Sequence, residues 1–434
     1  MWSNVKAYMY AGLAVRMSQV LSMNLEPSQD LSIRDREVRR RTFWACFVVD
    51  RLISCSCNKP FTFSPLSIEV SLPCIENAFM LEEDCRGPSL DNMLQSPGQV
   101  SQTGLLPFFI VAVHLWGDMT QLHISGGRRR YKHGPHDPEG EFYKKRLILS
   151  KFTAIMPSSL AWTVQNLRLH QVTGQAQAYI NICFLVHHAS CIMSQEYLPQ
   201  LESQYSLASE VDIVSSFDAA GISFDLDETA MVKPCMFSVN TITEMAGILT
   251  DGGEQAKCFL QSSFAANAVL TATAVHLWVL YTQTCDACPK HQALAEAEKL
   301  RQVMKTWQSS WKVATAYVET LEMLYKLYIY SYGKIVDSEL DCWDVGVDDI
   351  NGIDNSLTDV GESEPYLSAL SQRLYDKIRA ILTNPLLPLD VKKKNLRTYS
   401  RTLWQHMWAM GPIEGFGHDL IDRDEGMIDS ISVV

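Results

Sequence analysis

At residues 37–53 the chain reads EVRRRTFWACFVVDRLI. The segment opens on charged residues and continues with apolar and aromatic ones, without glycine or proline. It therefore predicts a helix that begins at the surface and enters the core. Ser32 and Asp35 resemble a capping box for this helix, because a hydroxyl and a carboxylate can each bind a free backbone N–H of the first turn. The helix is expected to continue to about Ser56.

Two charged residues, Asp50 and Arg51, stand in the apolar part of this helix. A buried charge without a partner costs on the order of several kcal/mol, so both are expected to be paired. Successive helix positions point about 100° apart, which argues against a pair between these two neighbours. Arg16 is a candidate partner for Asp50, and a separation above roughly 6 Å would exclude it.

The segments on either side complete the N-terminal part of the chain. Residues 3–24 predict a helix with a face of mainly small residues, made of Ala7, Ala11, Ala14, Met17 and Leu21. Residues 57–104 are rich in proline and glycine, which excludes long helices. The part from Pro60 to Pro73 is expected to be extended and to lie over the core.

The composition is that of a globular protein with a sizeable core. The 434 residues are 47% hydrophobic and 20% charged, with a formal net charge of −12 and a pI of about 5.4. An acidic chain is repelled by nucleic acid, so DNA contact would need a local basic patch or a separate module. The run Leu105 to Trp116 is too short to cross a membrane, and the polar residues between Phe264 and Tyr281 favour a helix buried in protein.

The cysteines predict an intracellular, reduced protein. The 12 cysteines are scattered, and the N-terminus shows no secretory signal. The sequence from Cys285 to Cys288 and His291 has zinc-like spacing, but no second pair exists to complete four ligands. His187 and His188 are adjacent on a predicted helix, so they point apart and cannot chelate one metal. We expect no catalytic, cofactor or metal site in this chain.

The remaining chain reads as all-helical, without a sheet of consequence. Predicted helical segments lie at 105–125, at 141–166 with an interruption at Pro157, at 174–194, at 259–281 and, as two helices, at 291–331, with closing helices at 365–383 and 391–410. Basic runs at Arg39–Arg41, Arg128–Lys132, Lys144–Arg146 and Lys392–Lys394 are read as solvated faces, with import signals or phosphate contacts as the alternative. The predicted divisions are residues 1–125, a basic Gly/Pro connection at 126–140, a helical continuation at 141–335, an acidic linker at 336–364, helices at 365–410 and an acidic tail at 411–434.

The order and spacing of motifs in residues 7–73 resemble the middle homology region of fungal zinc binuclear cluster transcription factors. A helix of the type A-x-R-M, here Ala14 to Met17, precedes E-x-R-R-R-x-F-W-x-x-F-x-x-D-R, then a proline, then L-P. The residues that carry this motif are Arg16, Arg40, Trp44, Asp50, Arg51, Pro60, Leu72 and Pro73. Asn58-Lys59 replaces the usual Gly-Arg. A weaker likeness extends to about residue 335.

The resemblance implies a non-enzymatic regulator of RNA polymerase II transcription in the nucleus, of the effector-sensing or inhibitory kind. In the family, zinc is held by an N-terminal six-cysteine module that reads DNA. This sequence contains no such pattern, so the resemblance implies contact with DNA only indirectly and no membrane. The implied partners are the transcription machinery or co-regulators, a zinc-cluster protein or a second copy, and a small-molecule effector. We place the effector cavity between the Trp44 helix and the 259–281 helix.

Two other readings stay open. Asp348-Asp349 lies in an acidic stretch, and paired carboxylates hold Mg²⁺ in some all-helical enzymes. That reading needs a second acidic motif on a facing helix, which the sequence does not offer. The other alternative is a non-catalytic protein-interaction scaffold.

Overall fold

The computed structural model describes residues 4–56, 59–95, 103–125, 133–134, 137–195, 228–282 and 290–309, with isolated positions from 311 to 396. These residues form helices and loops, and no β-strand occurs among them, which confirms the all-α prediction. The helices are α1 (Asn4–Val20), α2 (Ile33–Ser56), α3 (Glu76–Met80), α4 (Leu90–Gln95), α5 (Leu105–Ile124), α6 (Glu141–Ile155), α7 (Val164–Val172), α8 (Ala176–Gln195), α10 (Glu228–Asp251), α11 (Glu254–Leu260), α12 (Ser263–Thr282) and α13 (Lys290–Trp307), with 3₁₀ turns η1 (Pro65–Ser67) and η4 (Ser158–Leu160).

The chain divides into two compact units, Met1–Trp307 and Gln308–Val434, and all the named elements belong to the first. The predicted boundaries at 125, 140 and 335 remain predictions. The acidic linker 336–364 and the tail 411–434 lie outside the described residues, as do nearly all positions of the segment 365–410.

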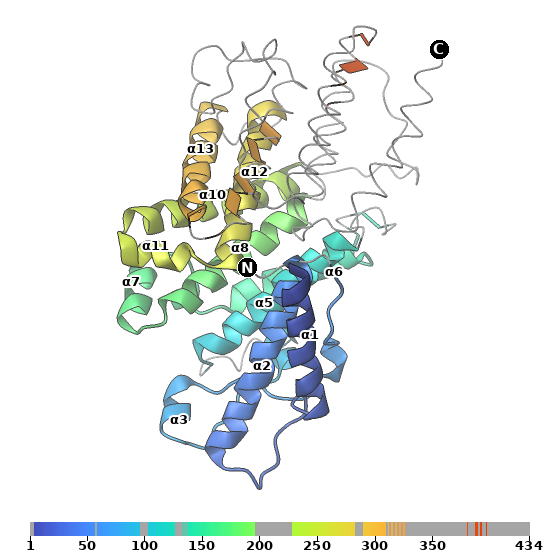
Figure 1. The fold of residues 1–434 in the computed structure, drawn as a ribbon, viewed down its shortest axis with the longest axis vertical. Coiled ribbons are helices and arrows are strands. Elements are labelled where there is room, and N and C mark those ends of the chain that lie inside the picture. The colour runs from blue at the N-terminus through green and yellow to red at the C-terminus, as the bar shows by residue number, and fades with distance from the viewer. Residues whose placement is uncertain are drawn as a thin grey trace. The chain divides into compact units, whose positions relative to one another are not determined.

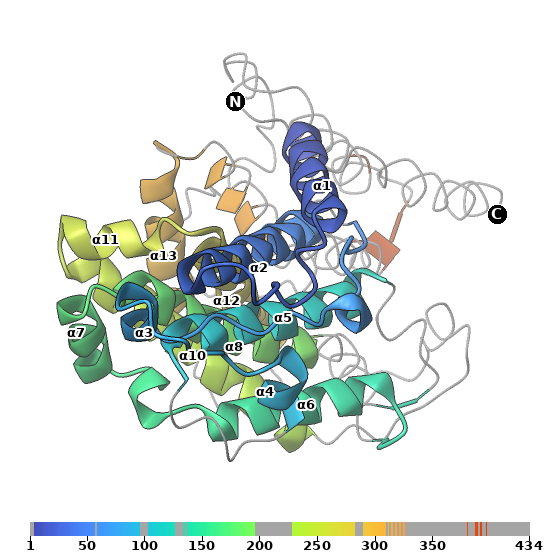
Figure 2. The ribbon, with the colours of Figure 1, turned by 90° about the horizontal axis from the view of Figure 1, so that it is seen from below.

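The first unit is built in layers that follow the chain (Figure 1). Helix α1 packs on α2, α2 packs on α5, and α5 packs on α8. Helix α8 then meets α10 and α12, and α13 covers α12. Figure 2 shows α2, α5 and α8 following one another across the unit. Helices α5, α8 and α12 therefore form the interior, with α1 at one side and α13 at the other.

Helix α12 is the most deeply buried element. It begins at Ser263 and not at residue 259 as predicted. Helix α11 ends at Leu260, and the helical conformation is interrupted at Gln261 and Ser262. The Ser262 hydroxyl accepts the N–H of Ala265 at 3.3 Å, as an N-cap does. Five of its alanines are buried, at 265, 266, 268, 272 and 274. Small side chains allow close approach on several sides at once, which fits the packing of α8, α10 and α13 around this helix.

Two buried histidines connect the interior helices. His188 of α8 accepts a hydrogen bond from Trp116 Nε1 at 3.0 Å and contacts Thr271 Oγ1 at 2.8 Å. Because Thr271 donates to the carbonyl of Asn267, the Nε2 of His188 must carry the proton and donate. His276 of α12 contacts Thr243 of α10 in the same way at 3.0 Å. Burial lowers the pKa of His188 to about 3 and that of His276 to about 4, so both are neutral at pH 7.

The buried face of α1 differs from the predicted one. Ala11, Val15 and Ser18 are buried against α2, whereas Met17 is 57% exposed and Leu21, just beyond the helix, is 50% exposed. Large and small apolar residues occur all round this helix, so periodicity alone gave the wrong rotation. The interruption predicted at Pro157 within residues 141–166 is confirmed, since α6 ends at Ile155 and α7 begins at Val164; α7 then continues to Val172, past the predicted end.

Within the described residues two helical windows are long and apolar enough to cross a membrane, Leu105–Ile124 and Ser263–Leu280. The first window is 72% buried inside the unit, and the second is 89% buried. Core helices of a folded domain have the same length and composition. The helix predicted at 105–125 is confirmed as α5, which continues past the apolar run that ends at Trp116.

Candidate functional site

The candidate site is the contact between α2 and residues 60–75, which we call the strap; this segment contains no α-helix, but the predicted extended course is interrupted by the 3₁₀ turn η1. The N-terminus of α2 is fixed by Ser32, whose hydroxyl accepts the N–H of Asp35 at 3.0 Å and donates to its carboxylate at 2.7 Å. The predicted cap is thus confirmed, although the Asp35 carboxylate binds the Ser32 hydroxyl and not a backbone N–H. The strap lies over the core as predicted, with Phe63, Val70 and residues 71–74 buried.

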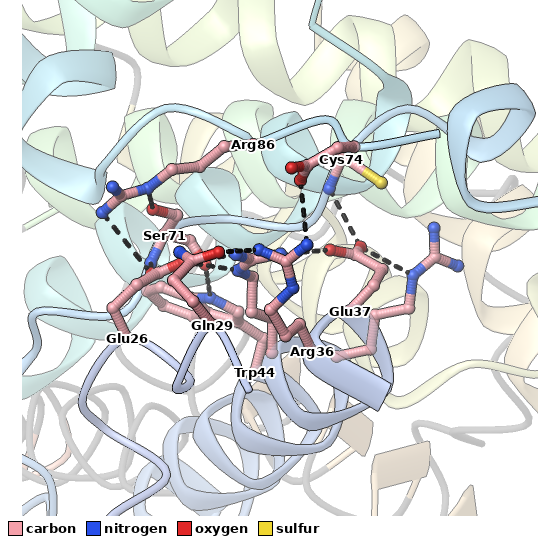
Figure 3. Close-up of polar contacts among 11 residues, drawn as sticks. Glu26, Gln29, Arg36, Glu37, Trp44, Ser71, Cys74 and Arg86 are labelled. Carbon is pink, nitrogen blue, oxygen red and sulfur yellow. Dashed lines mark hydrogen bonds and ion pairs between the residues drawn. The ribbon is translucent and has the colours of Figure 1, made fainter. Parts of the chain in front are cut away.

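Glu37 is the centre of the polar contacts at the first half of α2 (Figure 3). Its side chain is buried, and its Oε1 accepts the backbone N–H of Cys74 and the Nε–H of Arg41, each at 3.0 Å. Its Oε2 lies 3.3 Å from Nη1 of Arg40. One carboxylate therefore binds two arginines of its own helix and the backbone of the strap.

Arg40 extends this network to the turn before α2. It is 4% exposed, and its Nε donates to Glu26 at 2.8 Å. The other oxygen of Glu26 accepts the backbone N–H of Ser71 at 3.0 Å (Figure 3). Burial by itself would raise the pKa of Glu26, but the Ser71 N–H and the Arg40 guanidinium outweigh it and hold this pKa below its usual value. The strap is thus bound here by two carboxylates, the buried one of Glu37 and the half-buried one of Glu26.

The triple arginine is therefore not a uniform solvated face. Arg40 is buried, Arg41 also binds Glu76 at 2.9 Å, and half-buried Arg39 donates to the carbonyl of Leu21. Arg36 is buried as well; it donates to Gln29 and pairs with Asp84 at 3.3 Å. The reading of this run as an exposed patch is wrong because carboxylates on neighbouring segments take up its charge.

Trp44 binds the strap from the apolar part of α2. Its Nε1 donates to the carbonyl of Ser71 at 2.8 Å, and its ring makes edge contacts with Phe43 and Phe47 at centroid distances of 5.2 and 5.1 Å. Leu72 is fully buried beside this cluster. The polar and apolar contacts therefore hold the same few residues of the strap.

Asp50 and Arg51 bind the beginning of the strap. Arg51 is fully buried; its Nη1 donates to Asp50 at 2.7 Å and its Nη2 to the carbonyl of Phe63 at 3.1 Å. Asp50 also accepts the backbone N–H groups of Thr62 and Phe63, each at 3.1 Å. The guanidinium lies over the rings of Phe47 and Phe61, at 4.1 Å from each centroid. These contacts offset much of the cost of burying the two charges, although the Nε of Arg51 has no hydrogen-bond partner among the described residues.

The predicted partner of Asp50 was wrong. Arg16 is exposed and donates to Gln19 at 3.1 Å, while Asp50 pairs with its own neighbour. The 100° separation of neighbouring positions applies to their Cβ atoms. The long arginine side chain can still bring its guanidinium back to the carboxylate.

The structure brings together six of the eight motif residues: Arg40, Trp44, Asp50, Arg51, Leu72 and Pro73 are buried around the strap. Arg16 and Pro60 are exposed. Sequence reasoning gave no role to Glu26 in this contact. The spacing of Glu37 to Arg40 and Arg41, three and four positions apart, signals a helix-face ion pair. No local signal marks Glu26, because its partners are 14 and 45 residues away.

The other candidate chemistry adds nothing to this site. Cys285, Cys288 and Asp348-Asp349 lie outside the described residues. Among the residues that are described, no group of three or more His, Cys, Asp or Glu side chains could hold a metal ion. Cys55 is buried and its pKa is raised by that burial, which disfavours the reactive thiolate.

A separate cavity of about 780 Å³ lies among α6, η4, α8 and α10. This cavity does not lie at the predicted place between α2 and α12: α2 packs on α5, α5 packs on α8 and α8 packs on α12. An effector cavity between α2 and α12 stays a prediction. No metal ligand set lines the cavity, and its walls are mainly helical side chains from α8 and α10.

Comparison with known proteins agrees with the motif. Residues 3–102, which include α1, α2 and the strap, match the Fungal specific transcription factor domain. This part of the chain is thus similar to that domain, and the resemblance to the fungal zinc binuclear cluster transcription factors is confirmed. The matched residues contain all eight motif positions and the whole ion-pair network.

Similar curated proteins come from two fungi. The chain is 25% identical over 292 residues to the Zn(2)-C6 fungal-type transcription factor FTF1c of Fusarium oxysporum f. sp. lycopersici, covering 63% of this chain and 29% of the relative. It is 24% identical over 323 residues to FTF2 of the same fungus, covering 70% and 28%. An uncharacterized transcriptional regulatory protein of Schizosaccharomyces pombe is 21% identical over 355 residues, covering 75% and 50%. The chain thus spans at most half the length of these relatives, and no solved structure matches it.

Proposed function

We propose that this chain is the regulatory region of a fungal zinc-cluster-type transcription factor that controls RNA polymerase II transcription in the nucleus. Support comes from the family match over α1, α2 and the strap and from relatives whose names describe transcription factors. The net charge of −12 favours contact with proteins over contact with DNA phosphates. We infer that its partners are co-regulators or the transcription machinery.

The observation that carries this proposal is the exposed side of α1. Met9, Leu13 and Met17 are 66%, 56% and 57% exposed, and Val20 is 84% exposed. Met9, Leu13, Met17 and Val20 follow one another at helical spacing of three or four, so they form one apolar stripe. A contiguous apolar stripe on the surface is typical of a protein contact. The opposite face of α1 packs on α2. Because ion pairs and hydrogen bonds fix α2 to the strap, the stripe lies on a rigid support.

A reporter assay tests the proposal. The full 434-residue chain is fused to a heterologous DNA-binding module and expressed with a reporter gene in a fungal cell. We expect reporter transcription to differ from that of the module alone, and Leu13→Asp to remove most of the difference. Leu169→Asp on α7 is the matched control, since Leu169 is exposed to a similar degree, 49%. Transcription equal to that of the module alone would contradict the proposal, and equal effects of both variants would reject the stripe.

A further inference from the structure

The cavity among α6, η4, α8 and α10 is separate from the strap contact. Its volume of about 780 Å³ lies within the range of small-molecule sites. The lining is mostly apolar and includes Leu149, Met156, Leu160, Val186, Met193 and Phe237. Such walls favour a ligand with a substantial apolar body, because its burial removes apolar surface from water.

Two polar groups of α8 are available in this lining. His187 and Ser190 are both half-buried and three positions apart, so they share one side of the helix. The Nδ1 of His187 lies 3.4 Å from the hydroxyl of Ser238, and among the described residues its Nε2 has no hydrogen-bond partner. The Ser190 hydroxyl likewise has none, and neither atom is shut off from solvent. Both are free to bind a polar group of a ligand.

The electrostatics of the cavity favour a ligand without charge. Burial lowers the pKa of His187 to about 4, so the imidazole is neutral at pH 7. Only Arg146 and Glu244 among the lining residues carry charge, and their charges are opposite. An ionised ligand would lose hydration without meeting a net opposite charge.

Phe237 gives the cavity an aromatic contact. It lines the cavity although it is 68% exposed, and its ring meets that of His187 at a centroid distance of 5.9 Å. An exposed aromatic side chain at such a place gains stabilisation when a ligand covers it.

We propose that this cavity binds an uncharged organic molecule with an aromatic or other apolar body and one carbonyl or hydroxyl group. The body lies against Phe237 and the apolar walls, and the polar group bonds to His187 Nε2 and Ser190 Oγ. That such binding changes transcription rests on the proposed function. The binding itself does not, and it is measured on the purified chain.

The test uses prodan, a neutral naphthyl ketone whose emission shifts to the blue in apolar surroundings. We expect saturable binding to the purified full chain with a blue shift. Ser190→Ala removes one hydrogen bond to the ketone and is expected to weaken binding about 3- to 10-fold. Ser190→Phe places a ring in the cavity and is expected to weaken it at least about 10-fold by occupying the ligand's space.

Leu66→Ser is the matched control for adsorption to exposed apolar surface, since Leu66 is 98% exposed and lies outside the cavity. It should leave prodan binding unchanged. Phe237→Ser, at an exposed position, gives a further readout if the larger substitution prevents folding, and should weaken binding severalfold. Absence of saturable binding, or equal affinity of the wild type, Ser190→Ala and Phe237→Ser, would overturn the inference. A silent reporter in the transcription assay would leave this result unaffected.

Discussion

Removing the Asp50 carboxylate should destabilise the domain strongly. Asp50 is 3% exposed and is the anion that faces the fully buried guanidinium of Arg51. Asp50→Ala leaves that cation buried without its partner and also removes the acceptor of two strap N–H groups. Breaking a buried ion pair costs about 3–5 kcal/mol, and each orphaned N–H about 1–3 kcal/mol. Because these costs overlap, we expect a loss of about 4 kcal/mol.

The assay is urea unfolding of the purified chain, followed by the fluorescence of tryptophans such as Trp44. A stability loss appears as a lower midpoint with an unchanged slope against denaturant. Asp251→Ala at the exposed end of α10 is the matched control and should change stability by less than about 0.5 kcal/mol. A loss below about 1 kcal/mol for Asp50→Ala would refute the reasoning.

A double variant separates the ion pair from general damage. Arg51→Met removes the cation while keeping much of its apolar stem. If the cost of Asp50→Ala arises mainly from the orphaned charge, the double variant should be less destabilised than the sum of the two single variants, by about 1–3 kcal/mol. Simple additivity would show that the two residues stabilise the strap independently.

Two further predictions follow from backbone packing and from the buried histidines. A Cβ at Gly87 would lie 2.1 Å from the carbonyl oxygen of Leu72, so Gly87→Ala should cost about 1–3 kcal/mol in urea unfolding. Gly12→Ala on α1 meets nothing within 4 Å and should instead stabilise by about 0.5–1 kcal/mol; the reverse ranking would contradict this packing. Burial lowers the pKa values of His188 and His276, so both imidazoles are protonated in the unfolded chain before they are protonated in the folded one. Their contribution to the free energy of unfolding is therefore present above about pH 6.5 and should be lost as the pH falls below that value. Each should contribute about 1 kcal/mol of loss between pH 7 and pH 5.5, and a flat profile over that range would contradict their neutral burial.

The proposed surface and cavity divide the domain into three parts with different roles. The α2–strap contact supports α1, the outer stripe of α1 offers a protein contact, and the cavity lies two helix layers away behind α5. Helix α8 touches both α5 and α10. A ligand that orders α8 therefore has a packed route toward α2, which a comparison of hydrogen exchange with and without prodan can follow.

Local patterns in the sequence predicted much of the fold. The cap at Ser32, the helical course of α2 and the burial of Asp50 and Arg51 depend on neighbouring residues, so they can be read from spacing. The extended course of the strap follows from its prolines. The all-α class follows in the same way from helical periodicity without alternating strands.

Other features could not be predicted from the sequence, because they depend on contacts between distant segments. The rotation of α1 is set by packing on α2, since apolar residues occur on both of its sides. Arg40 changes from an expected surface cation to a buried one because Glu26 and the strap close over it. The cavity depends on how α6, α8 and α10 diverge, which no single helix encodes.

The sequence by itself determined that residues 33–56 form a helix that buries one acid and one base, each in need of a partner, because helix propensity and the cost of burying charge act locally. The tertiary structure decided which groups satisfy those charges. Arg51 folds back on Asp50, and Glu26 and Glu37 bind the strap across up to 45 residues of chain. Such partners are chosen by the packing of distant segments, where only buried carboxylates and backbone N–H groups within reach can pair.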